Sequence, residues 1–434
     1  PVIWCSGTDM SQPPRKSPLV SSKTTMLPEK VRLLDVSIGE AKAAGQLIKG
    51  ANYEFRYISP DAEQAPVALL MPAAEKLTWQ DAALFAPMDQ NLPEGYLFAR
   101  IRDLFPKQPL TPMHLLALVG QNGIGRLGYR LPEVPEIAPP RVLTKEELLR
   151  TRYSPETFAE LVAAYLSSGA GISGVQPKIM VPGRVAIPVP SLIVKAGSPD
   201  YPQLAVNEYL CLSAARRAGV AVPSFALSDD GQMLIIERFD LVTHDDGHVE
   251  RLGFEDVAAL AGLRVRDIHS DRKYQGSYQR VAELLRQLQL HSGNIHAFFE
   301  QVAFSIMVRN GDAHLKNFGV LYRSPSEVWL APMFDVVTTV IYKYTQYPGG
   351  PELEDRTLAL KLFAGRHSKS YPSLQQLHDF GRRVCGVSRP DHVLAAIASA
   401  MRDTLVEAKS DLRVPKDFLA RMGGAWGDGH VYGA

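Results

Sequence analysis

The chain has 434 residues, of which 46% are hydrophobic and 21% are charged, an ordinary composition for globular domains that argues against extensive disorder. A formal net charge of +1 excludes a generally basic protein that binds nucleic acid or acidic membranes through its overall charge, though not a local basic patch. No segment is apolar over the length needed to span a bilayer, and the three widely spaced cysteines form no CxxC pair. We therefore expect a cytoplasmic protein with no membrane contact, no disulfide framework and no structural zinc site.

The N-terminal third of the chain reads as a leader, a small module and a linker. Residues 1–28 are rich in Ser, Thr, Pro and Lys without hydrophobic periodicity, which is typical of a mobile segment. Strands are predicted at 33–38 and 53–57 and helices at 95–104 and 111–119. Four prolines between 132 and 140 interrupt regular structure and predict a linker after this α+β module.

Helices are expected to resume after the linker, at Thr144, which begins a capping box, and at Ser154, an N-cap followed by proline. The next segment, 167–176, is rich in Gly and Ser and precedes a predicted strand at 178–181. Glycine lets backbone N–H groups approach a phosphate closely, so this segment is a candidate phosphate loop. It matches neither a Walker A motif nor the usual kinase GxGxxG pattern, and such segments are more often flexible connections.

Three further features lie where a kinase places its nucleotide-binding groups. The apolar strand 192–195 ends in Lys195. In protein kinases, a strand likewise carries the lysine whose ammonium contacts the ATP phosphates. A helix expected to begin near Asn207 carries Glu208, whose carboxylate would keep a buried lysine charged. The apolar segment 233–240 runs into a polar connection, which predicts a hinge whose backbone contacts adenine. Taken singly, a surface lysine, a capping glutamate and an ordinary strand end are the favoured interpretations.

The segment 309–318, RNGDAHLKNF, carries residues that phosphoryl transfer requires. Asp312 and Asn317 have the spacing of the protein-kinase catalytic loop, in which the Asp accepts the proton of the attacking hydroxyl and the Asn binds Mg²⁺. Lys316 lies between them and would neutralise charge developing on the transferred phosphate. Asp335 follows another apolar stretch and would bind the same metal. The alternative is that these residues only form turns, because Asp and Asn side chains bond to nearby backbone groups.

Five motifs in a fixed order resemble the HipA family of bacterial serine/threonine kinases. They are GISGVQPK at 171–178, NEY at 207–209, ERFD at 237–240, NGDAHLKNF at 310–318 and LAPMFDV at 330–336. NLPEG at 91–95 and LLALVG at 115–120 are similar to the family's N-terminal subdomain, so the resemblance covers about residues 31 to 420. It implies an α+β, two-lobed protein-kinase-like fold, distantly similar to phosphoinositide kinases, with an additional N-terminal subdomain.

The resemblance also implies a division into domains. The ranges are a mobile leader at 1–28, a HipA-type N-terminal subdomain at 29–135, a kinase N-lobe at 141–240, a mostly helical C-lobe at 241–425 and a tail at 426–434. The N-lobe would contain the phosphate loop and the ATP lysine, and the C-lobe would contain the catalytic loop and the metal-binding Asp.

The implied activity is that of an ATP- and Mg²⁺-dependent serine/threonine protein kinase of the toxin–antitoxin type. Such a toxin arrests growth by phosphorylating an aminoacyl-tRNA synthetase. Its partner is a small helix-turn-helix antitoxin, and the toxin would contact DNA only indirectly, through this antitoxin. Asp312 is the implied base, with Lys316 beside it, and Asn317 and Asp335 are the implied metal ligands. The implied ATP-binding residues are Ser173, Gly174, Val175, Gln176, Lys178, Lys195, Glu237, Phe239 and His314.

Three of these residues have a more specific expected place. Glu237 and Phe239 would border the adenine. We expect His314 to brace the catalytic loop rather than to bind metal or act as the base, because Mg²⁺ prefers oxygen ligands and Asp312 already fills the role of base.

One departure from the family concerns self-inactivation. Well-studied members autophosphorylate a loop serine, and the corresponding residue here is Gly171, which cannot be phosphorylated. Ser173 is the expected substitute, with Ser167 and Ser168 as weaker candidates. A phosphate on Ser173 would add a charge of about −1.5 to −2 beside the ATP phosphates and displace the loop.

Two classes of function stay open. An active kinase is favoured because Lys195, Asp312, Asn317 and Asp335 are all present. The alternative is a nucleotide-binding regulatory protein or pseudokinase that acts with a DNA-binding antitoxin. The sequence does not name the protein substrate.

Overall fold

The computed structural model describes most of the chain between residues 28 and 433. The described residues are 28–58, 65–93, 98, 101–102, 105, 109–119, 123–132, 144–154, 156–157, 161, 178–181, 191–197, 201–265, 267–345, 350–365 and 367–433. The predicted leader, most of the predicted helix at 95–104, the prolines from 135 to 140 and the candidate phosphate loop lie outside these ranges.

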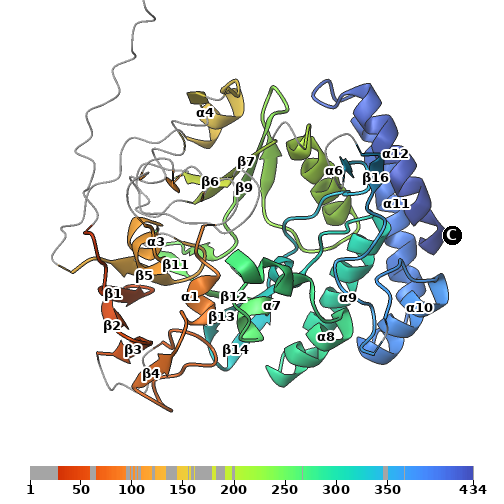
Figure 1. The fold of residues 1–434 in the computed structure, drawn as a ribbon. Helices are drawn as coiled ribbons and strands as arrows, with labels where there is room; N and C mark the ends of the chain where they lie inside the picture. Colours follow the sequence, from red (N-terminus) through yellow and green to blue (C-terminus); the bar gives the residue numbers. More distant parts are fainter. Residues whose placement is uncertain are drawn as a thin grey trace, which may run out of the picture. The chain divides into compact units, whose positions relative to one another are not determined.

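An antiparallel five-stranded sheet with the order β4-β3-β2-β1-β5 forms the N-terminal subdomain (Figure 1). Its elements are β1 (Leu33–Ile38), β2 (Ala41–Lys49), β3 (Tyr53–Tyr57), β4 (Thr78–Asp81), α1 (Ala86–Asp89), α3 (Pro112–Val119) and β5 (Leu127–Arg130). Buried and half-buried residues alternate along β1, as its sequence pattern predicts. A two-residue turn joins β1 to β2, and Gly39 adopts the φ of 59° that a tight hairpin turn requires.

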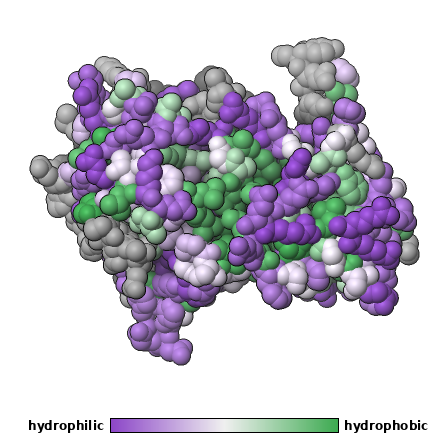
Figure 2. Space-filling model, turned by 90° about the horizontal axis from the view of Figure 1, so that it is seen from below, coloured by the Kyte–Doolittle hydropathy of each residue, from purple (hydrophilic) through white to green (hydrophobic). Residues whose placement is uncertain are grey.

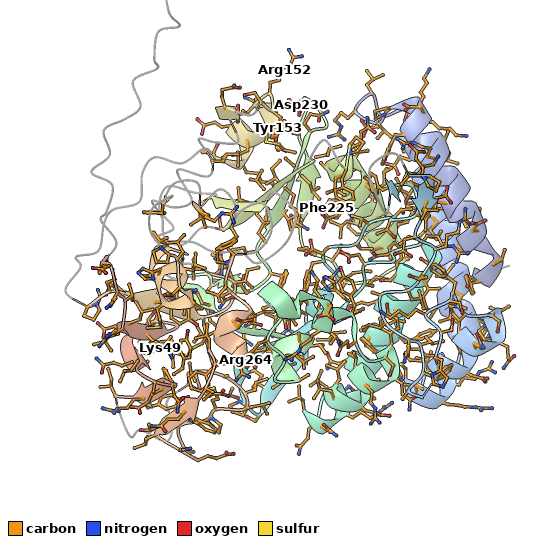
Figure 3. The ribbon with its side chains drawn as sticks, in the orientation of Figure 1. Lys49, Arg152, Tyr153, Phe225, Asp230 and Arg264 are labelled. Carbon is orange, nitrogen blue, oxygen red and sulfur yellow. The ribbon has the colours of Figure 1, made fainter. Side chains whose placement is uncertain are left out.

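A second sheet with the order β6-β7-β9-β8 carries the strand that ends near Lys195. The elements of this region are α4 (Lys145–Arg150), β6 (Lys178–Val181), β7 (Leu192–Ala196), α6 (Leu204–Arg217), β8 (Phe225–Leu227) and β9 (Met233–Glu237). All five residues of β7 are buried, because it lies between β6 and β9. The main-chain N–H of Tyr153 donates to the Asp230 carboxylate at 2.8 Å (Figure 3), which ties the residues after α4 to the β8–β9 turn.

Two helix starts in this region can be compared with the sequence. The capping box at Thr144 is confirmed: its Oγ accepts from the N–H of Glu147 at 3.1 Å, and Glu147 Oε2 accepts from the N–H of Thr144 at 2.7 Å. Helix α6 begins at Leu204, three residues before the expected start, after Gln203 with a φ of 56°.

The chain then forms short strands that bring the expected catalytic segment, residues 309–318, to a sheet edge. These are β10 (Leu241–Thr243), β11 (Val249–Arg251), β12 (Gly253–Asp256), β13 (Gly319–Ser324), β14 (Glu327–Leu330), β15 (Lys343–Thr345) and β16 (Glu352–Glu354). In the sheet β12-β13-β14, β13 directly follows the segment 309–318 and β14 leads to Asp335. The hairpin β13–β14 therefore links the two halves of the candidate site.

Helices make up most of the remaining chain. They are α7 (Val257–Leu260), η1 (Asp267–Tyr274), α8 (Tyr278–Gln287), α9 (Ser292–Met307), η2 (Leu315–Asn317), α10 (Leu374–Asp379), the π-helix η3 (Phe380–Val384), α11 (Pro390–Ala408), α12 (Lys416–His430) and η4 (Val431–Gly433). Helix α9 packs against α8, α11 and α12 (Figure 1). Phe304, Ile306 and Met307 on α9 are fully buried.

The C-terminal end of the chain differs from the expected tail. Helix α12 continues to His430, and Trp426 is fully buried, so the expected boundary at 425 falls inside a packed helix. No helix among the described residues is long and apolar enough to cross a membrane.

The N-terminal subdomain is joined to the following strands by polar contacts. Arg251 donates to the carbonyl oxygens of Gly125 at 2.7 Å and Gly123 at 3.2 Å. Gln90 bonds to the edge of β12, donating to Phe254 O and accepting from Asp256 N, both at 2.9 Å.

Figure 2 shows a face of the molecule on which hydrophobic residues gather in the middle and hydrophilic residues surround them.

Candidate active site

Lys195 is a buried lysine held by two carboxylates. Its Nζ lies 2.5 Å from Glu208 Oε1 and is also bonded to Asp335 Oδ1. The side chains of Lys195 and Glu208 are 6% and 1% exposed, so water contributes little to solvating them. Burial opposes the positive charge, but the carboxylates of Asp335 and Glu208 outweigh it and raise the pKa of Lys195. The structure thus brings together the strand lysine, the helix glutamate and the predicted metal-binding Asp.

The catalytic segment begins with a tight connection after α9. Arg309 adopts a left-handed φ of 58°, and the Asn310 side chain then accepts from the N–H of Asp312 at 3.0 Å. The N–H of Gly311 donates to Thr339 Oγ1 at 2.7 Å. A Cβ atom at position 311 would lie 2.7 Å from the carbonyl oxygen of Thr357, so a glycine is needed for this close approach.

Asn317 joins the two acidic residues through their main chain. Its Nδ2 donates to the carbonyl oxygen of Asp312 at 3.0 Å and to that of Asp335 at 3.3 Å. Because the amide nitrogen is engaged in this way, the amide oxygen is the atom that can bind a metal. Asp335 itself adopts a left-handed φ of 54°.

The donor set at Asn317 and Asp335 suits a hard cation. Among the described residues, no three His, Cys, Asp or Glu side chains gather into a metal cage. An amide oxygen and a carboxylate nevertheless fit Mg²⁺, which commonly takes one or two protein ligands and completes its shell with phosphate oxygens and water.

Tyr274, at the end of η1, contacts the expected base. Its hydroxyl donates to Asp312 Oδ1 at 2.7 Å. The sequence gives no sign of this contact, because a single Tyr 38 residues before Asp312 forms no pattern with it. Nor does it assign a role to Asn207, whose side chain bonds to the main chain of Thr338, beyond Asp335.

His314 is buried inside the catalytic segment. Its Nε2 lies 3.9 Å from Asp312 Oδ1, and its Nδ1 has no hydrogen-bond partner among the described residues. Burial, and then the charges of Lys273 and Lys316, hold the pKa of His314 well below its usual value. The imidazole is therefore neutral at pH 7, and its ring packs edge-on against Tyr274 with centroids 5.1 Å apart.

The two residues expected beside adenine lie at the end of β9 and just after it. Glu237 is half exposed and pairs with Lys145 Nζ at 2.6 Å. The ring of Phe239 stacks on that of Phe334 with centroids 5.3 Å apart. Since Phe334 precedes Asp335, Phe239 is packed next to the expected metal ligand.

Several expected ATP-binding residues lie outside the described ranges. These are Ser173, Gly174, Val175 and Gln176, together with Gly171. For Lys178 the backbone alone is described, and in the β6–β7 ladder its Cα is paired with that of Lys195.

Comparison with known proteins identifies the family. Residues 170–408, more than half of the chain, match the model of the HipA-like C-terminal domain, and residues 34–130 match that of the HipA N-terminal domain. The chain belongs to the HipA family. The resemblance indicated by the five motifs is thereby confirmed.

Curated relatives of this HipA-family chain are named as kinases. It is 26% identical to the putative kinase Y4dM of Sinorhizobium fredii over 276 residues, which cover 58% of this chain and 61% of that protein. It is 27% identical to a putative kinase of Haemophilus influenzae over 208 residues, covering 45% and 58%. The chain thus spans about three fifths of the length of these two relatives.

A solved structure shows the same fold. HipA of Shewanella oneidensis, determined in a complex with HipB and operator DNA, matches this HipA-family chain with a TM-score of 0.65 at 18% identity, covering 92% of this chain and 96% of that one. The likeness confirms the predicted fold class, including the additional N-terminal sheet subdomain.

Proposed function

We propose that the chain is an ATP- and Mg²⁺-dependent serine/threonine protein kinase. The observation that carries this proposal is the buried ammonium of Lys195 between Glu208 and Asp335. Asn317 in turn bonds to the main chain of both Asp335 and Asp312. Phosphoryl transfer requires a charged lysine, oxygen ligands for the metal and a carboxylate base. In this chain these groups belong to one hydrogen-bonded network. The kinase names of the curated relatives support the same conclusion.

Each residue of the network has a distinct role in the proposed reaction. Lys195 binds the α- and β-phosphates, and Asn317 and Asp335 hold Mg²⁺, which neutralises phosphate charge when bound. Asp312 accepts the proton of the serine hydroxyl as its oxygen bonds to the γ-phosphorus, and the bond from phosphorus to the ADP oxygen breaks. Lys316 stabilises the charge on the transferred phosphate. The neutral His314 braces the segment beside Asp312.

The proposed substrate and partner come from the family. We infer a serine on another protein as the acceptor, such as an aminoacyl-tRNA synthetase, and a helix-turn-helix antitoxin as a partner that contacts DNA. The solved HipA complex with HipB and operator DNA supports the second inference.

Transfer of ³²P from ATP to the protein itself and to a cell lysate tests the activity. Wild type should label protein in the presence of Mg²⁺, and Asp312→Asn should lower labelling at least about 100-fold, because general base catalysis typically contributes that much. Asp403→Asn is the matched control, since Asp403 is exposed on α11, and it should label like wild type. Equal labelling by wild type and Asp312→Asn would refute the mechanism, and ATP binding without labelling by any variant would support a nucleotide-binding regulatory protein.

Self-phosphorylation is tested by mapping the phosphorylated peptides of the protein. We propose Ser173 as the acceptor, because Gly171 occupies the position that carries the serine in well-studied relatives. Phosphopeptides of active protein incubated with Mg-ATP should contain phosphate on Ser173. Phosphate found elsewhere, or on no residue of an active enzyme, would contradict this assignment.

A further inference from the structure

Tyr274 provides a side-chain donor to the expected base. Its hydroxyl donates to Asp312 Oδ1 at 2.7 Å, a normal length for a hydrogen bond from a hydroxyl to a carboxylate. The residue comes from η1, an element outside the catalytic segment. Asp312 is thus positioned from a second part of the chain.

Several groups hold the Tyr274 ring in place. Lys369 Nζ donates to the carbonyl oxygen of Tyr274 at 2.8 Å. The ammonium groups of Lys273 and Lys369 lie 5.3 and 5.9 Å from the ring centroid, within the range of cation–π attraction. The ring of His314 packs edge-on against it. Two nearby positive charges also favour donation by the phenol O–H, because they stabilise the electron density that remains on oxygen.

The contact orients Asp312 without covering it. The Asp312 side chain remains 44% exposed, so a substrate hydroxyl can still reach the carboxylate while Oδ1 accepts from Tyr274. A hydroxyl that blocked the base would leave it buried. The exposure therefore favours a supporting role over an inhibitory one.

We propose that Tyr274 is a positioning residue whose hydroxyl fixes the orientation of the Asp312 carboxylate. This inference rests on the proposed kinase function. Hydrogen bonds to a charged group contribute more than neutral ones. Loss of the hydroxyl should therefore let the Asp312 carboxylate reorient and lower turnover, without weakening the binding of ATP.

The variant Tyr274→Phe removes the hydroxyl and keeps the ring contacts. We expect kcat about 10-fold lower, the low end for losing a hydrogen bond to a charged group, with the KM for ATP within about 2-fold of wild type. A fall in kcat with an unchanged KM for ATP assigns the effect to the transfer step and not to nucleotide binding.

Two further variants make the test decisive. Tyr209→Phe removes a hydroxyl 3.5 Å from Arg413 and should leave kcat unchanged. Lys369→Met removes the hydrogen bond to the Tyr274 carbonyl oxygen and should also lower kcat. This variant tests the inference independently if Tyr274→Phe unfolds. If wild type is active and folded Tyr274→Phe has the same kcat, the inference alone is overturned. A wild type that transfers no phosphate overturns the proposed function.

Discussion

Asn207 and Thr338 are joined by a pair of hydrogen bonds. Asn207 Nδ2 donates to the carbonyl oxygen of Thr338 at 2.9 Å, and the N–H of Thr338 donates to Asn207 Oδ1 at 2.8 Å. Both residues are fully buried. Asn207 precedes Glu208 on α6 and Thr338 follows Asp335 by three residues, so this pair fixes the separation of the two carboxylates that hold Lys195.

Asn207→Asp should destabilise the protein and lower transfer. The carboxylate has nearly the same size but cannot donate to the Thr338 carbonyl, and it places an unpaired charge in the interior. We expect the free energy of unfolding to fall by about 3 kcal/mol, the upper end for an unsatisfied buried group, as measured by urea denaturation. Asn294→Asp is the matched control, because Asn294 Oδ1 accepts from Leu330 N and an acid in the first turn of α9 suits the helix dipole. An equal fall in the free energy of unfolding in both variants would show that the hydrogen bonds between Asn207 and Thr338 make no special contribution to stability.

Lys195→Met should reduce stability as well as activity. It leaves Glu208 buried and Asp335 without their shared cation, which costs about 3 kcal/mol when one partner of a buried pair is removed. Adding Glu208→Gln to Lys195→Met should recover part of that loss, because it removes the uncompensated buried charge. A double-mutant cycle of unfolding free energies measures the coupling. Strictly additive losses would contradict the bonded network.

Glu255 should make stability fall as the pH rises toward 7. Burial raises the pKa of Glu255 from its ordinary 4.5 to about 7, although Leu69 N and Tyr322 Oη donate to its Oε1 at 2.7 and 2.9 Å. Between pH 4.5 and 7 the folded state therefore holds a proton that the unfolded state has released. The stabilisation is complete below pH 4.5 and is lost as the pH rises through 7.

The measurement compares wild type with Glu255→Gln from pH 4.5 to 7. Relative to the variant, wild type should lose about 1 kcal/mol of unfolding free energy per pH unit. Glu75→Gln, at an exposed position of the N-terminal subdomain, should follow wild type. A wild-type curve parallel to that of Glu255→Gln would mean that Glu255 titrates normally.

Gly311→Ala should misplace Asp312. A Cβ there would lie 2.7 Å from Thr357 O and 2.9 Å from Thr339 Oγ1, so the loop must move. We expect kcat to fall by about 100-fold, since a displacement of about 1 Å can have that effect. Gly423→Ala is the control: its Cβ would meet nothing within 4 Å, and inside α12 the change should add up to about 1 kcal/mol of stability. Unaltered kcat in Gly311→Ala would show that the tight loop is not required.

Local patterns explain why part of the site was predictable. Lys195, Asp312, Asn317 and Asp335 stand in short motifs, and the structure brings all four together. The capping box at Thr144 was equally local, since its partners lie three residues apart.

Other features depend on contacts that a sequence pattern does not encode. Tyr274 meets Asp312 only because η1 folds beside the catalytic segment, and Lys369 reaches Tyr274 from 95 residues away. The early start of α6 depends on the left-handed backbone of Gln203, a conformation that Gln does not signal. The phosphate loop, with Ser173, stays a prediction.

The left-handed backbone of Asp335 decides which inactive form of the protein can serve as a reagent. Most side chains resist this conformation, whereas Asn adopts it about as readily as Asp. Asp335→Asn therefore deletes the charge proposed to bind metal without straining the chain, while Asp335→Ala disturbs both the charge and the backbone. A folded, inactive Asp335→Asn protein is accordingly the form to immobilise when the cellular proteins that dock on this protein are to be captured and identified.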